Sequence, residues 1–494
     1  MTADYSREQT HPTRTGNMTW IPNNWVSLSF IVLYLLVLVR HAWAGHRHVR
    51  LLSDYLVAGR RLGGWVVALS FYATFVSTNT FIAGAGKSWD VGLTWCAGGA
   101  VTIALCCVSW FVVAPRFVPL TRKYDSLTVA DFLGYRYNSM ALRRTAGVVV
   151  CFASIIYLVA LYRGSAIALS SMLGMPYAWA VIIIFAVVTA YTLAGGFESV
   201  VLTDAMQGVL MVTGAVALAV AVIMKGGGLA NVMASLHEQD PELVSWRGKM
   251  PLTTILGIQI AVGMKCLVEP RQLSRFYGLK DTRALKLAAV VAPLLIMITF
   301  ICLLPLGALA HAFVPDAVIT SSDEVVPYLL SQAAVFGPVV SSAFLLVLLS
   351  AAMSSIDSVL LVAASAIDHD VMASGKGGQG TVGRTRIWLV GVSFVSMIAV
   401  LTPFTDDIVT ITAFSGSLYA ACFFPALVMG LFWRQATARG AMASLLCGSV
   451  AVVGWFVAKQ LRLTSTHEVY VGLGVSLIVY LVAGMISARQ RLAT

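Results

Sequence analysis

Charged residues are scarce in this chain. Asp, Glu, Lys and Arg together make up 11% of its 494 residues, whereas hydrophobic residues make up 59%. A soluble protein carries roughly twice that charged fraction, about 25%, so the composition excludes an ordinary soluble enzyme or binding domain. The net charge of +11 does not indicate a nucleic-acid partner either, because the basic residues lie in short polar stretches beside long apolar runs.

Motifs for covalent, redox or metal chemistry are also missing. The sequence has no HExxH, no P-loop and no dinucleotide-binding glycine pattern, and its eight histidines lie at or beyond the ends of apolar runs. We therefore expect no enzyme, no haem and no intramembrane metal chemistry. The cysteines form no CxxC pair and lie within apolar segments, so we expect small buried hydrophobic residues rather than disulfides or metal ligands. They are Cys96, Cys106, Cys107, Cys151, Cys266, Cys302, Cys422 and Cys447.

Long apolar runs dominate the sequence. A run of about 18 or more apolar residues is long enough to cross a bilayer as a helix. We therefore expect an all-α polytopic membrane protein with about thirteen transmembrane helices. Trp25 begins the first run, which we expect to be a retained helix because Arg40 and His41 follow it instead of a cleavage site. The runs lie at 25–44, 65–86, 91–115, 145–171, 177–196, 200–224, 253–269, 287–313, 338–367, 386–402, 407–433, 440–459 and 470–488.

Basic residues gather in every second loop, as Arg271, Arg275 and Lys280 do after the run 253–269. Cytoplasmic loops carry such an excess of Lys and Arg. The alternate loops carry acids, for example Asp240. We expect a multi-pass protein of the cell (inner or plasma) membrane, with the N-terminus outside and the C-terminus in the cytoplasm.

The runs fall into groups. Residues 1–24 form an extracytoplasmic tail and 25–44 an extra helix, 65–224 and 253–433 form two groups of five helices, and 440–488 form two C-terminal helices. The first helix of each group is interrupted, by Ser, Thr and Gly residues between 70 and 86 and by Glu269-Pro270. Interrupted helices at matching positions of two halves favour a transporter with a site at mid-membrane. The alternative is that small residues merely allow close helix packing.

Among the charged residues within or at the ends of apolar runs, four are candidates for function: Arg163, Asp204, Lys265 and Asp357. Such residues are costly in a bilayer and usually mark function. The hydroxyls of Ser354-Ser355, together with carbonyls freed by a broken helix, suit a hard cation. The alternative is serine bonding to the backbone and an aspartate paired with a buried base.

Three segments in this order resemble the sodium:solute symporter family, and the resemblance covers nearly the whole chain. They are Ser53–Arg60, Tyr191–Ser199 followed by Thr203, Asp204 and Gln207, and Ala351 with Ser354-Ser355. The resemblance implies a five-plus-five inverted repeat of the LeuT type, alternating access and sodium as the coupling ion. It implies a sodium site made of the carbonyls of Ala73, Val76 and Ala351 and the hydroxyls of Ser354 and Ser355. It also implies a second cation or proton site at Asp204, Asp357 and Ser358, where Asp357 replaces a hydroxyl residue of the family.

The resemblance says less about the solute. Where sugar carriers have a Tyr-Glu pair and a gating Tyr, this chain has Gly98-Gly99 and Lys265, while Glu269-Pro270 is similar to the Gln-Pro of proline-type members. A cavity-facing Lys265 favours a carboxylate or amino-acid-like solute, whereas pairing with Glu269, one turn on, would leave a neutral solute such as a sugar. A symporter-like membrane sensor and a passive channel are further alternatives. We expect the solute and the bilayer, and no obligate protein, as partners. The candidate solute-binding residues are Ser77, Thr78, Thr80, Gly98, Gly99, Arg163, Lys265 and Glu269.

Overall fold

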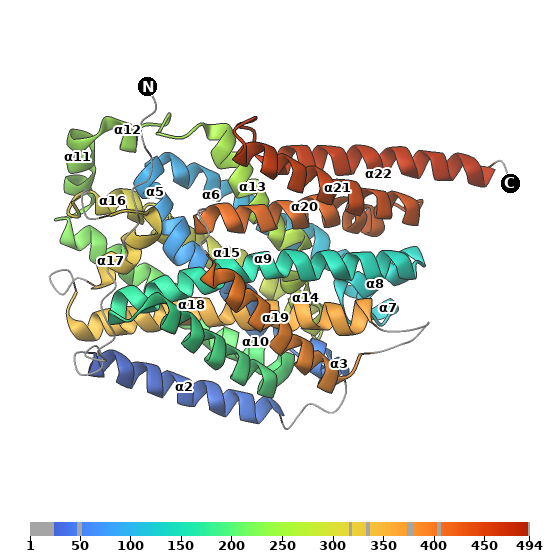
Figure 1. Cartoon of the computed structure of the whole chain (residues 1–494), viewed down its shortest axis with the longest axis horizontal. Helices are drawn as coiled ribbons and strands as arrows, with labels where there is room; N and C mark the ends of the chain where they lie inside the picture. The colour runs from blue at the N-terminus through green and yellow to red at the C-terminus, as the bar shows by residue number, and fades with distance from the viewer. Residues whose placement is uncertain are drawn as a thin grey trace.

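The computed structural model describes residues 24–46, 52–315, 319–331, 336–372, 380–402 and 407–492. Within these ranges every regular element is a helix, apart from one isolated bridge between Leu62 and Leu279. Long helices run side by side along the long axis of the molecule (Figure 1). A bilayer requires such helices because it offers no water to unpaired backbone groups. The predicted all-α membrane architecture is therefore observed.

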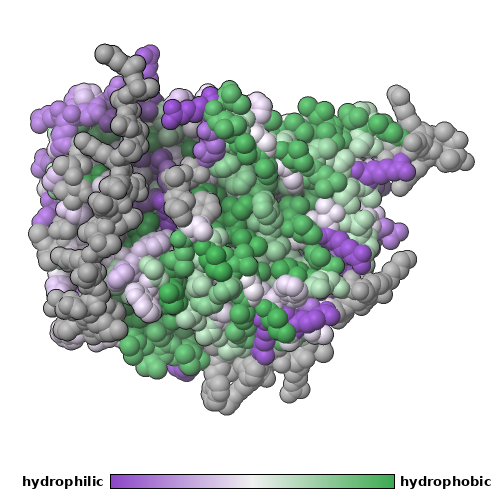
Figure 2. Space-filling model, in the orientation of Figure 1, coloured by the Kyte–Doolittle hydropathy of each residue, from purple (hydrophilic) through white to green (hydrophobic). Residues whose placement is uncertain are grey.

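The surface carries the matching pattern. Hydrophobic residues cover the middle of the face shown in Figure 2, and hydrophilic residues gather toward its two ends. In the described part of the chain, ten helices are long and apolar enough to span a membrane, or eleven when a bent pair is counted as one further span. The N-terminal helix adds a shorter apolar stretch, Trp25–His41.

The described residues of the first half of the chain form twelve helical elements. They are α2 (Trp25–His46), α3 (Leu52–Val57), η1 (Ala58–Arg60), α4 (Gly64–Phe75), η2 (Asn79–Gly84), α5 (Ala85–Val91), α6 (Thr94–Val108), η3 (Ser109–Val113), α7 (Ala114–Lys123), α8 (Val129–Tyr137), α9 (Met140–Leu173) and α10 (Tyr177–Lys225). The interruption predicted in the first core helix lies between α4 and η2, where the axis bends by 58°.

Helix α10 is two arms joined at Gly196. Its 49 residues would extend about 74 Å as one straight helix, more than twice the ~30 Å of a bilayer core. Gly196 breaks the helical conformation with φ 65° and ψ −175°, a backbone geometry that favours glycine. The division predicted between 177–196 and 200–224 falls at this residue.

The second half follows the same pattern of long helices. It contains α11 (Leu229–Gln239), α12 (Pro241–Val244), α13 (Leu252–Val268), α14 (Pro270–Gly278), α15 (Thr282–Leu303), α16 (Leu306–Ala310), η5 (Ser322–Glu324), α17 (Val325–Ser331), α18 (Pro338–Ser365), η6 (Ala366–Val371), α19 (Val382–Leu401), α20 (Ile408–Phe432), α21 (Ala438–Gln460) and α22 (Glu468–Leu492).

The second predicted interruption lies at Glu269, between α13 and α14. Pro270 occupies the first turn of α14, where its missing N–H costs nothing. The chain therefore continues as a second helix instead of entering a loop, and the placement of Arg271 and Arg275 in a basic loop is wrong. Both side chains are only 1% exposed, and each is paired with a buried acid that compensates its charge.

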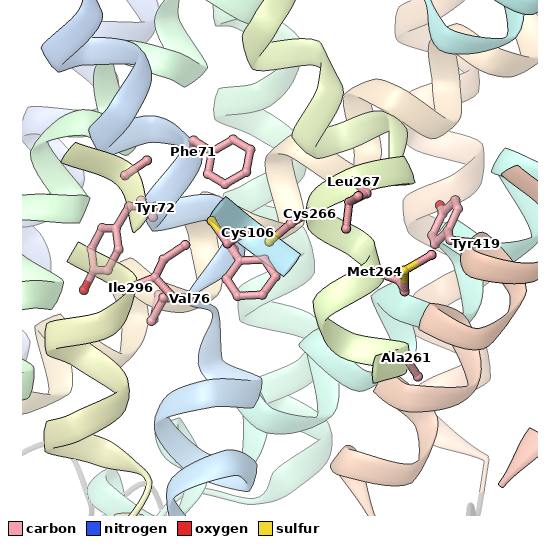
Figure 3. Close-up of a cluster of buried hydrophobic side chains, with 14 of the residues drawn as sticks. Phe71, Tyr72, Val76, Cys106, Ala261, Met264, Cys266, Leu267, Ile296 and Tyr419 are labelled. Atoms are coloured by element: carbon pink, nitrogen blue, oxygen red, sulfur yellow. The ribbon is translucent and has the colours of Figure 1, made fainter. Parts of the chain in front are cut away.

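The broken helices pack on a shared apolar core. Figure 3 shows Phe71 and Tyr72 on α4, Val76 at the break, and Cys266 on α13 within one cluster of buried side chains. Phe71 packs edge-on against Trp110, with ring centroids 4.9 Å apart. This core holds α14, the second part of the other broken helix, against α4, and Phe71 stacks on Phe276 there.

The cysteines are free throughout the described residues. Cys106, Cys266 and Cys422 are buried, as expected from their apolar surroundings. Cys447 is exposed on α21, so its predicted burial is wrong. An apolar run on a peripheral helix has an outer face as well as an inner one, and composition cannot distinguish the two.

Candidate functional site

Uncharged oxygens meet where α4 ends against α18. The last carbonyls of a helix lack partners within it. The Ser354 hydroxyl donates to the Ala73 carbonyl at 3.0 Å and also lies 3.4 Å from the Ala351 carbonyl. The Ser355 hydroxyl donates to the Thr74 carbonyl at 3.1 Å. The structure thus brings together Ala73, Ala351, Ser354 and Ser355 of the predicted sodium site.

The surroundings of these oxygens fit a hard cation. Val76 is buried at the break, where its N–H donates to the Tyr72 carbonyl and closes the last turn of α4. Carbonyls at such a helix end lack partners within the helix. Serine hydroxyls can rotate to turn their lone pairs toward an ion, and carbonyls need no change. Oxygen ligands of this kind are those that hard cations take in proteins. Thr74 is an oxygen donor that the predicted set lacks.

A second buried cluster contains the acids Asp204 and Asp357. Arg275 of α14 donates to Asp204 at 2.6 Å and to the Ser358 hydroxyl at 2.5 Å. Ser70 donates to the same Asp204 oxygen at 2.8 Å. Asp204, Asp357 and Ser358 are therefore neighbours as predicted, but Asp204 has a fixed guanidinium partner.

Asp357 is held differently. The Tyr191 hydroxyl donates to one of its oxygens at 2.9 Å, and the Ser358 hydroxyl donates to the other at 3.1 Å. One arginine thus faces two carboxylates, all of them at most 1% exposed. When both acids are ionised, this group of three charges has one negative charge in excess.

A cavity lies between the two broken helices. Its lining includes Ser77, Thr80 and Lys265 of the predicted solute-binding residues. Its walls are mostly apolar. The remaining lining residues are Phe75, Asn79, Gly84, Trp95, Tyr157, Ile258, Gln259, Val262, Arg271, Phe300, Leu304, Val409 and Thr412.

Lys265 is buried beside this cavity, and its ammonium has no hydrogen-bond partner in the described part of the chain. It lies over the ring of Tyr157, 3.6 Å from the centroid. The guanidinium of Arg271 lies 4.8 Å from the centroid of the same ring. The Tyr157 hydroxyl shares a hydrogen bond of 3.2 Å with Ser77 on the broken first helix. Two cations are therefore gathered on one aromatic ring.

Glu269 does not take Lys265 as its hydrogen-bonded partner. Its carboxylate pairs with Arg271 at 3.1 Å. The backbone of Glu269 is extended, with φ −70° and ψ 124°, so the helical i,i+4 geometry that a pair with Lys265 requires ends there. Lys265, Arg271 and Glu269 together leave one positive charge in excess.

Five predicted solute-binding residues do not line the cavity: Thr78, Gly98, Gly99, Arg163 and Glu269. Gly98 and Gly99 instead leave room for side chains of neighbouring helices. A Cβ on Gly98 would lie 2.4 Å from Cγ of Gln259, and one on Gly99 would lie 2.6 Å from Leu304.

Thr78 is buried against Gly164, away from the cavity lining. Arg163 is half-buried on α9, and its charge acts on Asp323 of η5. Burial and the nearby Asp407 raise the pKa of Asp323 to about 6, while Arg163 opposes this shift. Arg163 thus lies near the acidic cluster of Asp323 and Asp407 and is not part of the cavity lining.

The lining also contains residues that the prediction lacks, chiefly Asn79, Tyr157, Gln259 and Arg271. For Arg271 a signal was available, since Pro270 is typical of the first turn of a helix, and Arg271 and Arg275 follow at i,i+4 spacing. A glutamine or tyrosine in an apolar run carries no comparable signal, because such residues are also common in helix contacts.

Known proteins resemble this chain over most of its length. The family model for the sodium:solute symporter family matches residues 55–448. The sodium/pantothenate symporter of Escherichia coli is 28% identical over 90% of this chain and 92% of its own length. The Haemophilus influenzae sodium/pantothenate symporter is 27% identical over 89% and 91%. The osmoregulated proline transporter OpuE of Bacillus subtilis is 25% identical over 94% and 95%.

Solved structures show the same fold. A Na+-coupled sialic acid symporter in a substrate-bound, outward-open state superposes with a TM-score of 0.79, at 16% identity, over 93% of this chain and 98% of that one. The inward-facing conformation of Mhp1 gives a TM-score of 0.55 at 13% identity, over 87% and 92%. The chain therefore shares the overall arrangement of helices of these two proteins.

Proposed function

Because the chain belongs to the sodium:solute symporter family, and is thus a sodium-coupled symporter rather than an enzyme, we propose that its solute is a small carboxylate. One observation carries the proposal: the ammonium of Lys265 lies beside the cavity and has no hydrogen-bond partner among the described residues. On insertion scales a buried lysine costs about 2.5–3.5 kcal/mol. The carboxylate of an incoming solute would neutralise it.

The excess charge supports this choice. Glu269 is committed to Arg271, so an ammonium at Lys265 has no hydrogen-bonded counter-ion among the described residues. A neutral sugar would leave that charge uncompensated. Of the solutes that the relatives transport, pantothenate carries a carboxylate and proline is a zwitterion. Both have the anionic group that Lys265 would bind.

Sodium would bind at the oxygen cluster between α4 and α18, formed by the carbonyls of Ala73, Val76 and Ala351 and the hydroxyls of Ser354 and Ser355. Because the Ala73 carbonyl and Ser354 come from different helices, an ion there would hold the first broken helix against α18. Ser77, on the same broken helix, contacts Tyr157 in the solute cavity. Because the sodium ligands and Ser77 belong to the same broken helix, sodium binding would also fix Ser77 in the position that binds solute.

We also propose a membrane topology with about thirteen spans. Two halves of five helices, each beginning with a broken helix, form an inverted repeat, and Gly196 divides α10 into two of the spans. With the extra N-terminal helix and two C-terminal helices, the count is about thirteen. The excess of basic loops would then place the C-terminus in the cytoplasm and the N-terminus outside.

The test is uptake of labelled carboxylates into proteoliposomes containing the purified protein. We expect uptake of pantothenate or a related carboxylate that requires an inward sodium gradient and stops when choline replaces sodium. Lys265→Met should abolish carboxylate uptake, whereas Lys280→Met, at an exposed lysine beyond the cavity, should retain it. Neutral sugars taken up as well as carboxylates, or uptake by Lys265→Met equal to that of the unaltered protein, would refute the carboxylate assignment.

A further inference from the structure

The solute cavity has polar groups at two levels. Lys265 and Gln259 both belong to α13 and both line the cavity. They are six residues apart, which is about 9 Å along a helix axis. Most other side chains that line the cavity are apolar, Phe75, Val262 and Phe300 among them.

The position of Gln259 is built by its neighbours on α6. The Thr102 hydroxyl lies 2.9 Å from Oε1 of Gln259 and 3.1 Å from its backbone carbonyl, so it donates to this residue. With Oε1 engaged in this way, the side-chain N–H groups of Gln259 are left for the cavity. Gly98 makes the arrangement possible, since any Cβ there would collide with the Gln259 side chain.

Asn79 supplies a group of the opposite kind. Its side-chain nitrogen donates to Thr412 at 2.6 Å, which orients the amide. Its Oδ1 is buried and has no hydrogen-bond partner among the described residues. A buried acceptor of this kind normally has a donor, and the cavity that Asn79 lines is where one can enter.

From these positions we infer that the solute is an elongated monocarboxylate with uncharged hydroxyl or amide groups at the end away from its carboxylate. The carboxylate binds Lys265. The groups far from the carboxylate accept hydrogen bonds from Gln259 and donate to Asn79. A hydroxyl can do both, because it is a donor and an acceptor. The inference rests on the proposed function and deepens it.

A compact amino acid does not fit this spacing. In proline the nitrogen and the carboxylate are attached to the same carbon, so one molecule cannot reach both Lys265 and Gln259. Pantothenate joins its carboxylate to two hydroxyls through an amide-containing chain. The geometry therefore favours a pantothenate-like solute over a proline-like one.

The experiment compares two ligands on the full-length protein in nanodiscs, by calorimetry in sodium chloride. Pantothenate is the full ligand, and N-acetyl-β-alanine retains the carboxylate and amide but lacks the distal hydroxyls. We expect pantothenate to bind at least tenfold more tightly. Gln259→Leu should remove most of that difference while changing N-acetyl-β-alanine affinity less than twofold.

The controls separate this inference from the proposed function. Gln239→Leu, at an exposed glutamine on α11, should leave both affinities unchanged, and Lys265→Met should weaken both. Thr102→Val leaves Gln259 in place but frees its amide. It should reduce pantothenate affinity severalfold, and it tests the same point if Gln259→Leu does not fold. Equal affinity for the two ligands, or an equal loss for both in Gln259→Leu, would overturn the inference and leave the carboxylate assignment standing. Failure of both ligands to bind would instead refute the assignment itself.

Discussion

Removing the guanidinium of Arg275 should destabilise the protein more than removing any exposed arginine. Arg275 is the positive partner of Asp204 at 2.6 Å, and both side chains are buried. Loss of one member of such a pair leaves an uncompensated charge and costs about 3–5 kcal/mol. Here the loss also leaves Asp204 and Asp357 together without a cation, so we expect Arg275→Met to lie at the upper end of that range.

The neighbouring hydrogen bonds limit the effect. Asp204 would retain the Ser70 hydroxyl at 2.8 Å, which stabilises the carboxylate but supplies no positive charge. In the double variant Asp204→Asn with Arg275→Met, the negative charge is removed with the positive one. We therefore expect the double variant to recover roughly 2–3 kcal/mol relative to Arg275→Met alone.

Unfolding in detergent micelles, followed by tryptophan fluorescence, would measure these differences. Arg283→Met, at an exposed arginine at the start of α15, is the matched control and should lie within about 0.5 kcal/mol of the unaltered protein. Purely additive losses in the double variant would mean that Arg275 and Asp204 do not interact energetically. A loss below about 1 kcal/mol in Arg275→Met would refute the assignment of a buried ion pair.

Two further predictions concern the sodium site and the acidic cluster at η5. Ser354→Ala should raise the sodium concentration for half-maximal uptake about tenfold, since one oxygen ligand is worth roughly 1–2 kcal/mol. Sodium titrations of uptake measure this concentration, and Ser341→Ala, near the start of α18, is the control. An unchanged sodium dependence in Ser354→Ala would exclude Ser354 as a ligand. The raised pKa of Asp323, about 6 against 3.8, means that the folded state holds this proton more tightly than the unfolded state does. The penalty of charging Asp323 is absent below about pH 4 and complete above about pH 6, where it is about 3 kcal/mol. Stability should therefore fall as pH rises through that window, and Asp323→Asn should flatten the curve in unfolding measurements between pH 4 and 7; parallel curves for the two proteins would contradict the assigned shift.

Much of the architecture could be predicted because it depends on local composition. A bilayer imposes long apolar runs, and a break needs glycine, proline or clustered hydroxyl residues, so Glu269-Pro270 and the region around Val76 were visible in the sequence. The pairing of Ser354 with the Ala73 carbonyl follows from the motif that carries the family resemblance. These features do not require knowledge of which helices touch.

The partners of the charged residues could not be predicted in the same way. Arg275 follows an apolar run in a basic stretch, and loop charges of this kind usually report topology. Only the turn of α14 back into the protein brings Arg275 to Asp204 and Arg271 to Glu269. The i,i+4 spacing of Lys265 and Glu269 predicts a pair, but the extended backbone at Glu269 ends the helix on which that pair depends. Side-chain partners across a helix break are a property of the assembled bundle.

The ring of Tyr157 has a consequence for turnover. A carrier must return empty across the membrane after each delivery, and a bare ammonium would make that return slow. With Lys265 resting 3.6 Å from the ring centroid, the empty form keeps a cation–π contact worth about 0.5–2 kcal/mol. An arriving solute must displace this contact, which lowers its apparent affinity by roughly two- to thirty-fold. The contact that lowers solute affinity therefore also speeds the return of the empty carrier. A variant with a non-aromatic residue at position 157 would bind its solute more tightly and transport it at a lower rate.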